Sequence, residues 1–341
     1  MSESLKATAA AIASVQDPDG SIPWEPGRHV DPWNMTEAAM GLDTVGFHRE
    51  ARAAYRWLFD RQRDDGTWAS AYMRGDISDP TFDANFCAYP TVGCWFHFMQ
   101  TGDERWLRRA WRVIEPALDA VLDLQMSSGA IAWARDPDGR IWPEALVASS
   151  SSIFHSLRCG VTIAEHLGCD RPDWELSLAS LEASVAEGSG PFMDKDRFSM
   201  DHYYPALSGV LQRDEALANL DDAWARFVVE GAGCRCTDDR PWVTSGETCE
   251  LVIAEAVVGR SDRAEALFEW VQHLRDDDGM YWTGANHPGG EVWPNEKTTW
   301  SAGAVLLAAD ALSGGPTLAL FSGSALASKP MIEVRDAGER A

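Results

Sequence analysis

Apolar residues recur along the chain with the period of α-helices, in segments of two kinds. One kind is rich in small and apolar residues, as in SAGAVLLAADAL, and the other mixes apolar residues with Arg, Asp and Glu, as in REARAAYRWLFDRQ. The first kind suits the buried inner helices of a ring, and the second suits outer helices with one face in solvent. The predicted inner segments are 34–47, 81–101, 147–166, 202–212, 245–259 and 298–313, and the predicted outer segments are 4–15, 48–62, 103–124, 171–187, 214–230 and 261–275.

The connections between these segments differ in length and contain a degenerate repeat. Joins from inner to outer segments are short and contain glycine, whereas joins from outer back to inner segments are long. Four of the long joins read QDPDGSIPW (16–24), QRDDGTW (62–68), QMSSGAIAW (125–133) and LRDDDGMYW (274–282). Six inner and six outer helices predict an all-α (α/α)6 toroid with its long loops on one rim. Alternation within 129–142 and 279–293 predicts short β-hairpins in that rim.

The predicted toroid is a single domain that spans residues 1–315. Beyond it, residues 316–341 lose the helical period, so we expect a partly ordered C-terminal tail.

Two of the rim loops share a Trp-Pro pair followed by a glutamate, in DGRIWPEA (138–145) and GGEVWPNEK (289–297). Glu144 is predicted to open the third inner helix and Glu296 the sixth, which places the two carboxylates half a turn apart around the ring. A pair of carboxylates across a cleft is what hydrolysis of a glycosidic bond requires, with one as general acid and one as general base. Packing against Trp and Pro is expected to desolvate each glutamate and raise its pKa.

A purely structural role is the alternative for these glutamates, because acidic residues at helix starts interact favourably with the helix dipole. Asp83, at the start of the second inner helix, is the second candidate for the general acid. Other rim residues offer hydrogen bonds to sugar hydroxyls or aromatic faces for stacking on pyranose rings. The predicted substrate-binding residues are Trp24, Asp31, Trp33, Asn34, Asp83, Asn85, Trp142, Asp201, His202, Tyr203, Trp242, Glu247, Trp282 and Trp293.

Composition narrows the classes of partner. The formal net charge is −24, which argues against nucleic acid and anionic membranes, since phosphate contacts need a basic surface. No apolar run approaches the length of about 20 residues that spans a bilayer, and the N-terminus has no signal-peptide pattern, so a cytoplasmic location is expected. Seven scattered cysteines fit reduced thiols, and no set of residues at ligand spacing predicts a metal or another cofactor. Oligomeric state is left open.

Residues 30–313 resemble the six-hairpin glycosidases of the glucoamylase type. The likeness is carried by TGDERWLRRAWRVIEPALDAVLDLQ, GAIAWARDPDGRIWPEA and NEKTTWSAGAVLLAAD. It implies that Glu144 is the general acid and Glu296 the general base, although Trp-Pro-Glu-Ala stands here where that group has Trp-Glu-Glu. More narrowly, the chain resembles mycobacterial hydrolases of methylmannose polysaccharides, a group often labelled prenyltransferase-like. This resemblance implies an inverting, endo-acting α-(1→4)-mannanase that binds an oligo- or polysaccharide.

Three other classes of function remain open. Terpene cyclases and prenyltransferases are toroids with similar QxxDGxW repeats, but their Asp-x-Asp-Asp, DDxxD and zinc motifs do not occur in this sequence. A polysaccharide lyase or sugar epimerase would use residues such as His202 and Tyr203. A non-catalytic carbohydrate-binding scaffold would leave its polymer intact, and product analysis distinguishes all of these from a hydrolase.

Overall fold

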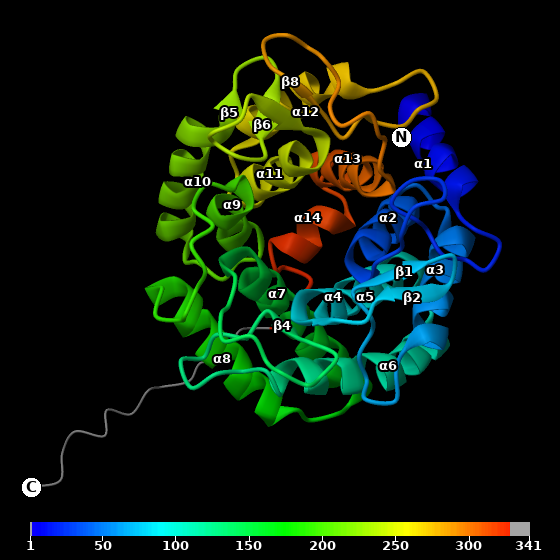
Figure 1. Ribbon diagram of the computed structural model, residues 1–341, viewed down its shortest axis with the longest axis vertical. Coiled ribbons are helices and arrows are strands. Elements are labelled where there is room, and N and C mark those ends of the chain that lie inside the picture. Colours follow the sequence, from blue (N-terminus) through cyan, green and yellow to red (C-terminus); the bar gives the residue numbers. More distant parts are fainter. Residues whose placement is uncertain (1, 328–341) are drawn as a thin grey trace, which may run out of the picture.

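The computed structural model describes residues 2–327, and an inner ring of helices forms its centre (Figure 1). Each ring helix contacts the next, and the last packs against the first, so the ring is closed. In ring order the inner helices are α2 (Pro32–Thr44), α4 (Ala84–Ala88) with α5 (Pro90–Thr101), α7 (Val147–Leu167), α9 (Ser199–Leu207), α11 (Ser245–Val257) and α13 (Thr299–Leu312).

A second layer of helices surrounds the ring, each packed on one or two inner helices (Figure 1). The outer helices are α1 (Glu3–Val15), α3 (His48–Arg61), α6 (Glu104–Leu122), α8 (Pro172–Glu187), α10 (Arg213–Phe227) and α12 (Ser261–Val271), which continues into the 3₁₀ turn η1 (Gln272–Leu274). The predicted all-α toroid is therefore confirmed. Across residues 2–327, no helix combines the length and apolarity needed to cross a bilayer.

The second inner position differs from the single helix predicted over 81–101. A short strand, β3 (Phe82–Asp83), precedes α4, and the helix is interrupted between α4 and α5 at Tyr89. Pro90 explains the interruption, because proline has no N–H to donate to the carbonyl four residues earlier. At the other end of α4, Asp83 is the N-cap, and its side chain accepts a hydrogen bond from the Phe86 N–H at 3.1 Å.

Each loop of the degenerate repeat follows one outer helix and packs against the next outer helix. In the first loop, the Gln16 amide donates to the Gly20 carbonyl at 2.8 Å and to the Glu50 carbonyl of α3 at 2.9 Å. Gly20 has a φ of 101°, and a Cβ there would lie 2.6 Å from the Ala53 carbonyl oxygen. Only glycine tolerates both conditions. The loops at 62–68 and 125–133 repeat this arrangement against α6 and α8.

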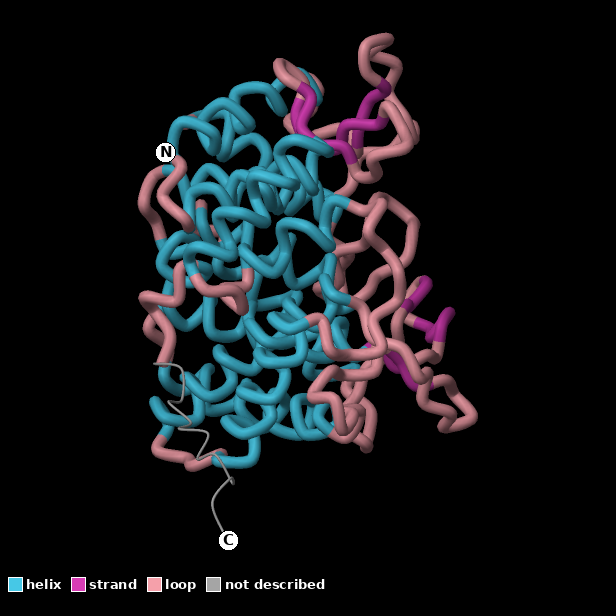
Figure 2. The backbone as a smooth tube through the Cα atoms, turned by 90° about the vertical axis from the view of Figure 1, so that its left-hand side faces the viewer, coloured by secondary structure: helices cyan, strands magenta, loops and turns pink. Residues whose placement is uncertain are grey.

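Short strands lie in the long loops, which gather on one side of the helical body (Figure 2). Two pairs are antiparallel: β1 (Ala71–Met73) with β2 (Asp76–Asp79), and β3 with β4 (Ala134–Arg135). The predicted hairpin over 279–293 contains β8 (Gly284–Asn286), which also completes an unpredicted four-stranded sheet. That sheet has the order β5 (Val228–Val229), β6 (Gly233–Arg235), β7 (Trp242–Thr244) and β8.

A short helix, α14 (Pro316–Phe321), lies in the middle of the ring in Figure 1, in the region predicted to be a tail. It contacts α13, α11 and α5. The Phe321 ring stacks on His155 of α7 with centroids 4.8 Å apart, and burial lowers the pKa of His155 to about 3. The remainder of the predicted tail, residues 328–341, lies outside the described residues.

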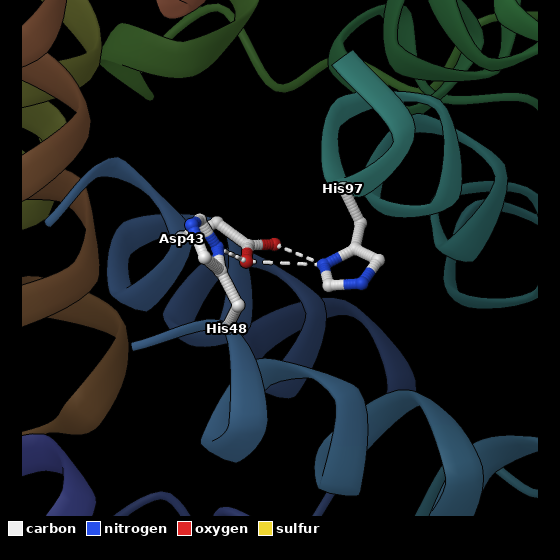
Figure 3. A group of neighbouring side chains, drawn as sticks. All are labelled: Asp43, His48 and His97. Carbon is white, nitrogen blue, oxygen red and sulfur yellow. Dashed lines mark hydrogen bonds and ion pairs between the residues drawn. The ribbon is translucent and has the colours of Figure 1, made fainter. Parts of the chain in front are cut away.

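A buried carboxylate ties three helices together near the carboxyl end of α2 (Figure 3). Asp43 lies within 2.8 Å of His48 Nδ1, at the start of α3, and within 2.9 Å of His97 Nδ1, in α5. Asp43 and His97 are both buried, and the His97 ring packs on Trp106 of α6. The two imidazoles therefore satisfy a carboxylate that would otherwise be costly to bury.

We expect Asp43→Asn to lower the free energy of unfolding by about 3 kcal/mol, because it removes the charge that both histidines contact in a buried site. Chemical denaturation monitored by tryptophan fluorescence measures this change. Asp60→Asn, an exposed change in α3, is the matched control and should shift stability by less than about 0.5 kcal/mol. Equal stability of the Asp43 variant and the control would contradict a structural role for this cluster.

Candidate active site

Carboxylates surround the rim at the amino ends of the inner helices. In ring order they are Asp31, Asp83, Glu144, Asp201, Glu247 and Glu296. Three of them make main-chain hydrogen bonds at helix starts: Asp31 accepts from the N–H of Asn34, Asp83 from that of Phe86, and Asp201 from that of Ala148. These three are partly explained by capping.

Glu144 and Glu296 lie on opposite sides of the ring, because α7 and α13 occupy opposing positions in the closed series of inner helices. Each lies three residues before its helix, which begins at Val147 or Thr299, rather than in the first turn as predicted. On the α7 side, Ala145 pairs with Phe192, which keeps the chain extended beyond Glu144. Both glutamates therefore belong to rim loops.

The Trp-Pro pairs do not bury these glutamates. Trp142 is 43% exposed and Trp293 is 54% exposed, and both glutamates are partly exposed. One side-chain oxygen of Glu144, Oε2, is nevertheless buried. Oε1 of Glu296 accepts a hydrogen bond from Thr283 Oγ1 at 3.3 Å.

Glu296 also borders a cavity of about 420 Å³ on the outer side of its loop. Glu25, Trp282 and residues of the outer helix α1, among them Ser14, share this cavity. Trp282, which was predicted to bind substrate, therefore borders the α1 side, where the Lys297 ammonium lies over its ring at 5.0 Å.

Main-chain hydrogen bonds of Trp133 link Glu144 to Ala84, the residue next to Asp83. The N–H of Trp133 donates to the Glu144 carbonyl at 3.1 Å, and its own carbonyl accepts from the N–H of Ala84 at 2.9 Å. The two candidate acids are thus neighbours on the same part of the rim. Burial raises the pKa of Asp83 to about 7, and the nearby Asp31 and Asp79 act in the same direction.

Aromatic rings from opposing helices meet across the axis of the ring. The Trp33 ring, in α2, lies 6.5 Å from Tyr204 of α9, 6.0 Å from Trp300 of α13 and 5.9 Å from Tyr89. Trp24 stacks on Trp300 with centroids 6.0 Å apart. Since α2 and α9 face each other in the ring, this cluster closes the centre and forms an aromatic floor beneath the rim.

Four residues at the rim or in the first turns of inner helices have unpartnered polar atoms. Asn34, Asn85, Glu144 and Glu247 each have a buried side-chain oxygen that accepts no hydrogen bond from any residue in 2–327. They belong to four different sectors of the ring. Buried polar atoms in proteins are nearly always hydrogen-bonded, so these oxygens are candidates to accept hydrogen bonds from a ligand.

Two buried glutamates lie in the ring that were not predicted as site residues. Burial raises the pKa of Glu37, in α2, to about 8, and an indole of Trp300 lies against its carboxyl group. Burial, together with the nearby Glu37, raises the pKa of Glu250 in α11. Tyr203 and Tyr204 donate hydrogen bonds to Glu250. The available signal for Glu250 was its place among three glutamates in the mainly apolar segment 245–259.

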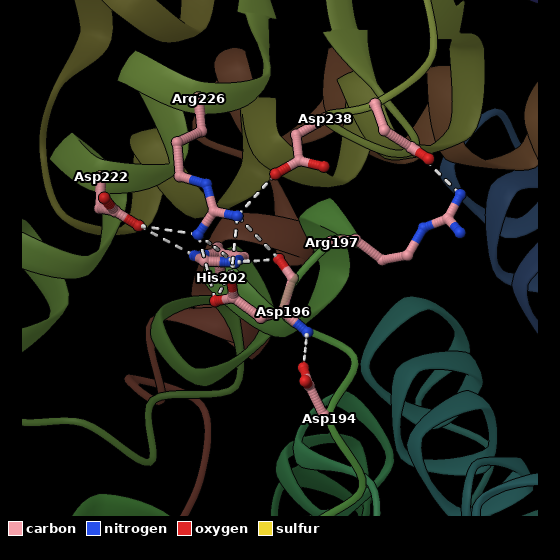
Figure 4. A network of polar contacts seen from close by, with 8 residues as sticks. Asp194, Asp196, Arg197, His202, Asp222, Arg226 and Asp238 are labelled. Atoms are coloured by element: carbon pink, nitrogen blue, oxygen red, sulfur yellow. Dashed lines mark hydrogen bonds and ion pairs between the residues drawn. The ribbon is translucent and has the colours of Figure 1, made fainter.

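Two predicted substrate-binding residues are engaged within the protein. Tyr203 is fully buried and its hydroxyl binds Glu250. His202 lies in a polar network towards α10, where Nδ1 is 3.0 Å from Asp222 Oδ2 and Nε2 is 2.7 Å from the Asp196 carbonyl (Figure 4). A contact of His202 with substrate would have to replace one of these partners.

We expect the free energy of unfolding to fall as pH rises from 6.5 to 8. Glu37 and His48 have pKa values raised by folding, Glu37 to about 8, so the native state holds protons that the unfolded chain releases. Their stabilisation is present at low pH and is lost as pH passes the folded pKa. His155, whose pKa is lowered, opposes this trend only below about 6.5.

Denaturation midpoints at several pH values across this window measure the slope, which is about 1.4 kcal/mol per pH unit for each extra proton bound. Glu37→Gln should flatten the slope. Stability that rises between pH 6.5 and 8 would show that these groups do not govern the pH dependence.

Comparison with known proteins identifies the family. No protein-family model matches the chain. The MMP endo-(1,4)-3-O-methyl-alpha-D-mannosidase of Mycolicibacterium hassiacum is 46% identical over 311 residues, which cover 91% of this chain and 86% of that protein. Among solved structures, a glycosidase variant in complex with glucose has a TM-score of 0.75 at 17% identity, covering 91% of this chain and 96% of that one. The GH63 mannosylglycerate hydrolase of Thermus thermophilus, in complex with Tris and D-glycerate, has a TM-score of 0.70 at 13% identity, covering 89% and 99%.

The two structural similarities establish a shared fold. The sequence identity to the mannosidase over nine-tenths of the chain establishes that the two proteins are homologous. The chain belongs to the family of this endo-mannosidase and is a glycoside hydrolase.

Proposed function

We propose that this protein is an endo-acting hydrolase of methylmannose polysaccharide, that it cleaves α-(1→4) bonds between 3-O-methylmannose units, and that its fold is the (α/α)6 toroid of the six-hairpin glycosidases. The substrate is that of the relative at 46% identity. The observation that carries the proposal is the 46% identity to this endo-mannosidase over 91% of the chain, and the rim of carboxylates above an aromatic floor is consistent with it. Cytoplasmic location and the lack of nucleic-acid and membrane partners remain predictions.

The aromatic floor suits a methylated sugar. Trp33, which is only partly buried, offers an apolar face, which favours the C–H face of a pyranose and an O-methyl group over a fully hydroxylated edge. The oxygens of Asn34 and Asn85 are available to accept hydrogen bonds from the remaining hydroxyls. Binding of a neutral sugar chain in this site requires no cationic side chain.

In the proposed mechanism Glu144 is the general acid and Glu296 the general base. Glu144 protonates the leaving glycosidic oxygen, while Glu296 removes a proton from a water that attacks the anomeric carbon from the opposite face. The oxygen–hydrogen bonds and charges balance, because one proton enters the leaving group and one leaves the water. This pathway inverts the anomeric configuration, and it needs a gap of about 6.5–9.5 Å between the carboxyl groups for the water.

The test is to incubate the protein with 3-O-methylmannose oligosaccharides of defined length and with unmethylated α-(1→4)-mannan. Shorter methylated oligosaccharides with new reducing ends are expected, and proton NMR of the first product should show the β-anomer. An α-anomer as first product would refute inversion. Release of monosaccharide only, an unsaturated product or the absence of cleavage would refute the endo-hydrolase.

A further inference from the structure

A groove lies at the rim beside the site, between the loop before α9 and the hairpin that follows β8. Its volume is about 850 Å³, and Phe198, Thr237, Trp242, His287 and Trp293 are among the residues that line it. A volume of this size falls in the range of sites that hold small-molecule ligands. The proposed acid–base chemistry uses no residue of this groove.

Trp293 presents an exposed aromatic surface within the groove. Its main-chain carbonyl accepts a hydrogen bond from the Trp242 indole N–H, and the two rings meet edge to face with centroids 4.8 Å apart. The main-chain N–H of Trp293 donates to the Gly284 carbonyl at 3.0 Å. These two bonds hold the backbone of Trp293, and its ring contacts Trp242 while 54% of the residue is exposed. An exposed indole is suited to stack on a sugar ring.

Two residues of the groove are connected to rim residues of the proposed active site. Cys236 borders the groove, and its thiol forms a hydrogen bond with Glu247 in the first turn of α11. From Trp293 the chain passes in three residues to Glu296, the proposed base. The groove and the proposed base therefore belong to the same rim loop.

The chemistry of the groove fits a neutral, partly apolar chain. Arg240 and Glu291 contribute opposite charges, and Arg197 is paired with Asp239 at 2.8 Å. Thr237 has a buried hydroxyl without a hydrogen-bond partner in the described part of the chain. Aromatic faces beside isolated hydrogen-bonding groups are typical of carbohydrate sites, whereas an anionic ligand would require an excess of cations.

We propose that this groove binds 3-O-methylmannose units remote from the cleaved bond and that Trp293 determines the preference of the enzyme for long chains. The proposal rests on the proposed function and deepens it. It attributes cleavage within the chain to a second region, apart from the catalytic residues, that binds distant sugar units. A remote subsite of this kind contributes only with substrates long enough to reach it.

The experiment compares Trp293→Ala with the wild-type enzyme on methylated oligosaccharides of increasing length. We expect KM for the longest chain to rise about tenfold with kcat unchanged, and KM for the shortest cleaved chain to stay the same. Trp293→Phe should recover part of the loss, since it keeps an aromatic face. Leu176→Ala, which truncates a comparably exposed apolar side chain on α8, is the control and should change neither constant.

An unchanged KM on long chains, or an equal rise on chains of every length, would overturn the groove proposal while leaving the hydrolase intact. Calorimetric titration of the wild type and Trp293→Ala with the intact polysaccharide tests binding without turnover. Weaker binding by the variant supports the groove even if the wild type cleaves none of the oligosaccharides, a result that would refute only the proposed function. Equal binding by both proteins would overturn the groove.

Discussion

Glu296→Gln is expected to lower kcat by about 10²–10⁴-fold, because it removes the group that accepts the proton of the attacking water. The side chain keeps its size and can still bond to Thr283 Oγ1, so fold and KM should change little. Loss of a base affects attack on every substrate. Activity on an aryl α-mannoside with a good leaving group should therefore fall by a similar factor, which steady-state kinetics on both substrates measures.

Glu25→Gln is the matched control for this prediction, since Glu25 shares the outer cavity with Glu296 but belongs to another loop. It should retain wild-type kcat. If both variants lost activity equally, the outer cavity rather than the pit would be responsible. If Glu296→Gln kept most of its activity, the role of base would pass to another rim carboxylate, and Glu247, with its buried unpartnered oxygen, would be examined first.

Glu144→Gln is expected to lower kcat on the natural chain by about 10²–10⁴-fold and to leave activity on the activated aryl mannoside nearly unchanged. The reason is that a sugar alkoxide is a poor leaving group and must be protonated to depart, whereas the phenolate of a phenol with a low pKa departs without a proton. This difference separates the acid from the base. It is measured by the ratio of kcat/KM for the two substrates in each variant.

Asp138→Asn, at the exposed tip of the same hairpin, controls for disturbance of the loop and should be neutral. Asp83→Asn provides the decisive comparison, because Trp133 places Asp83 next to Glu144 and its raised pKa of about 7 suits a proton donor. If Asp83→Asn showed the leaving-group pattern and Glu144→Gln did not, the acid would be Asp83.

The ring could be predicted because its causes are local. The apolar period marks inner and outer helices, and the glycine of each repeat is required where a loop touches the next outer helix, as Gly66 does at the Pro116 carbonyl. Counting helices was then enough to place Glu144 and Glu296 half a turn apart. The interruption at Tyr89 was missed because a single proline was read as part of a continuous apolar segment.

The composition of the site was less predictable. A tryptophan in a loop was read as substrate-binding, yet Trp24 and Trp282 differ in their surroundings, one against Trp300 at the floor and the other on the α1 side. The pairing of Glu37 with Glu250 was invisible, because these residues lie 213 positions apart and meet only when α2 and α11 enter the same ring. Their raised pKa values arise from that shared burial.

By itself, the sequence determined the main inner and outer helices and the two loops with the Trp-Pro-Glu pattern, but not α14 or the division of 81–101, since periodicity, glycine requirements and proline positions act over a few residues. Only the tertiary structure decided which carboxylates are buried and which aromatic rings meet at the centre of the ring. Those properties depend on desolvation and on contacts between distant segments, and neither exists before the ring closes.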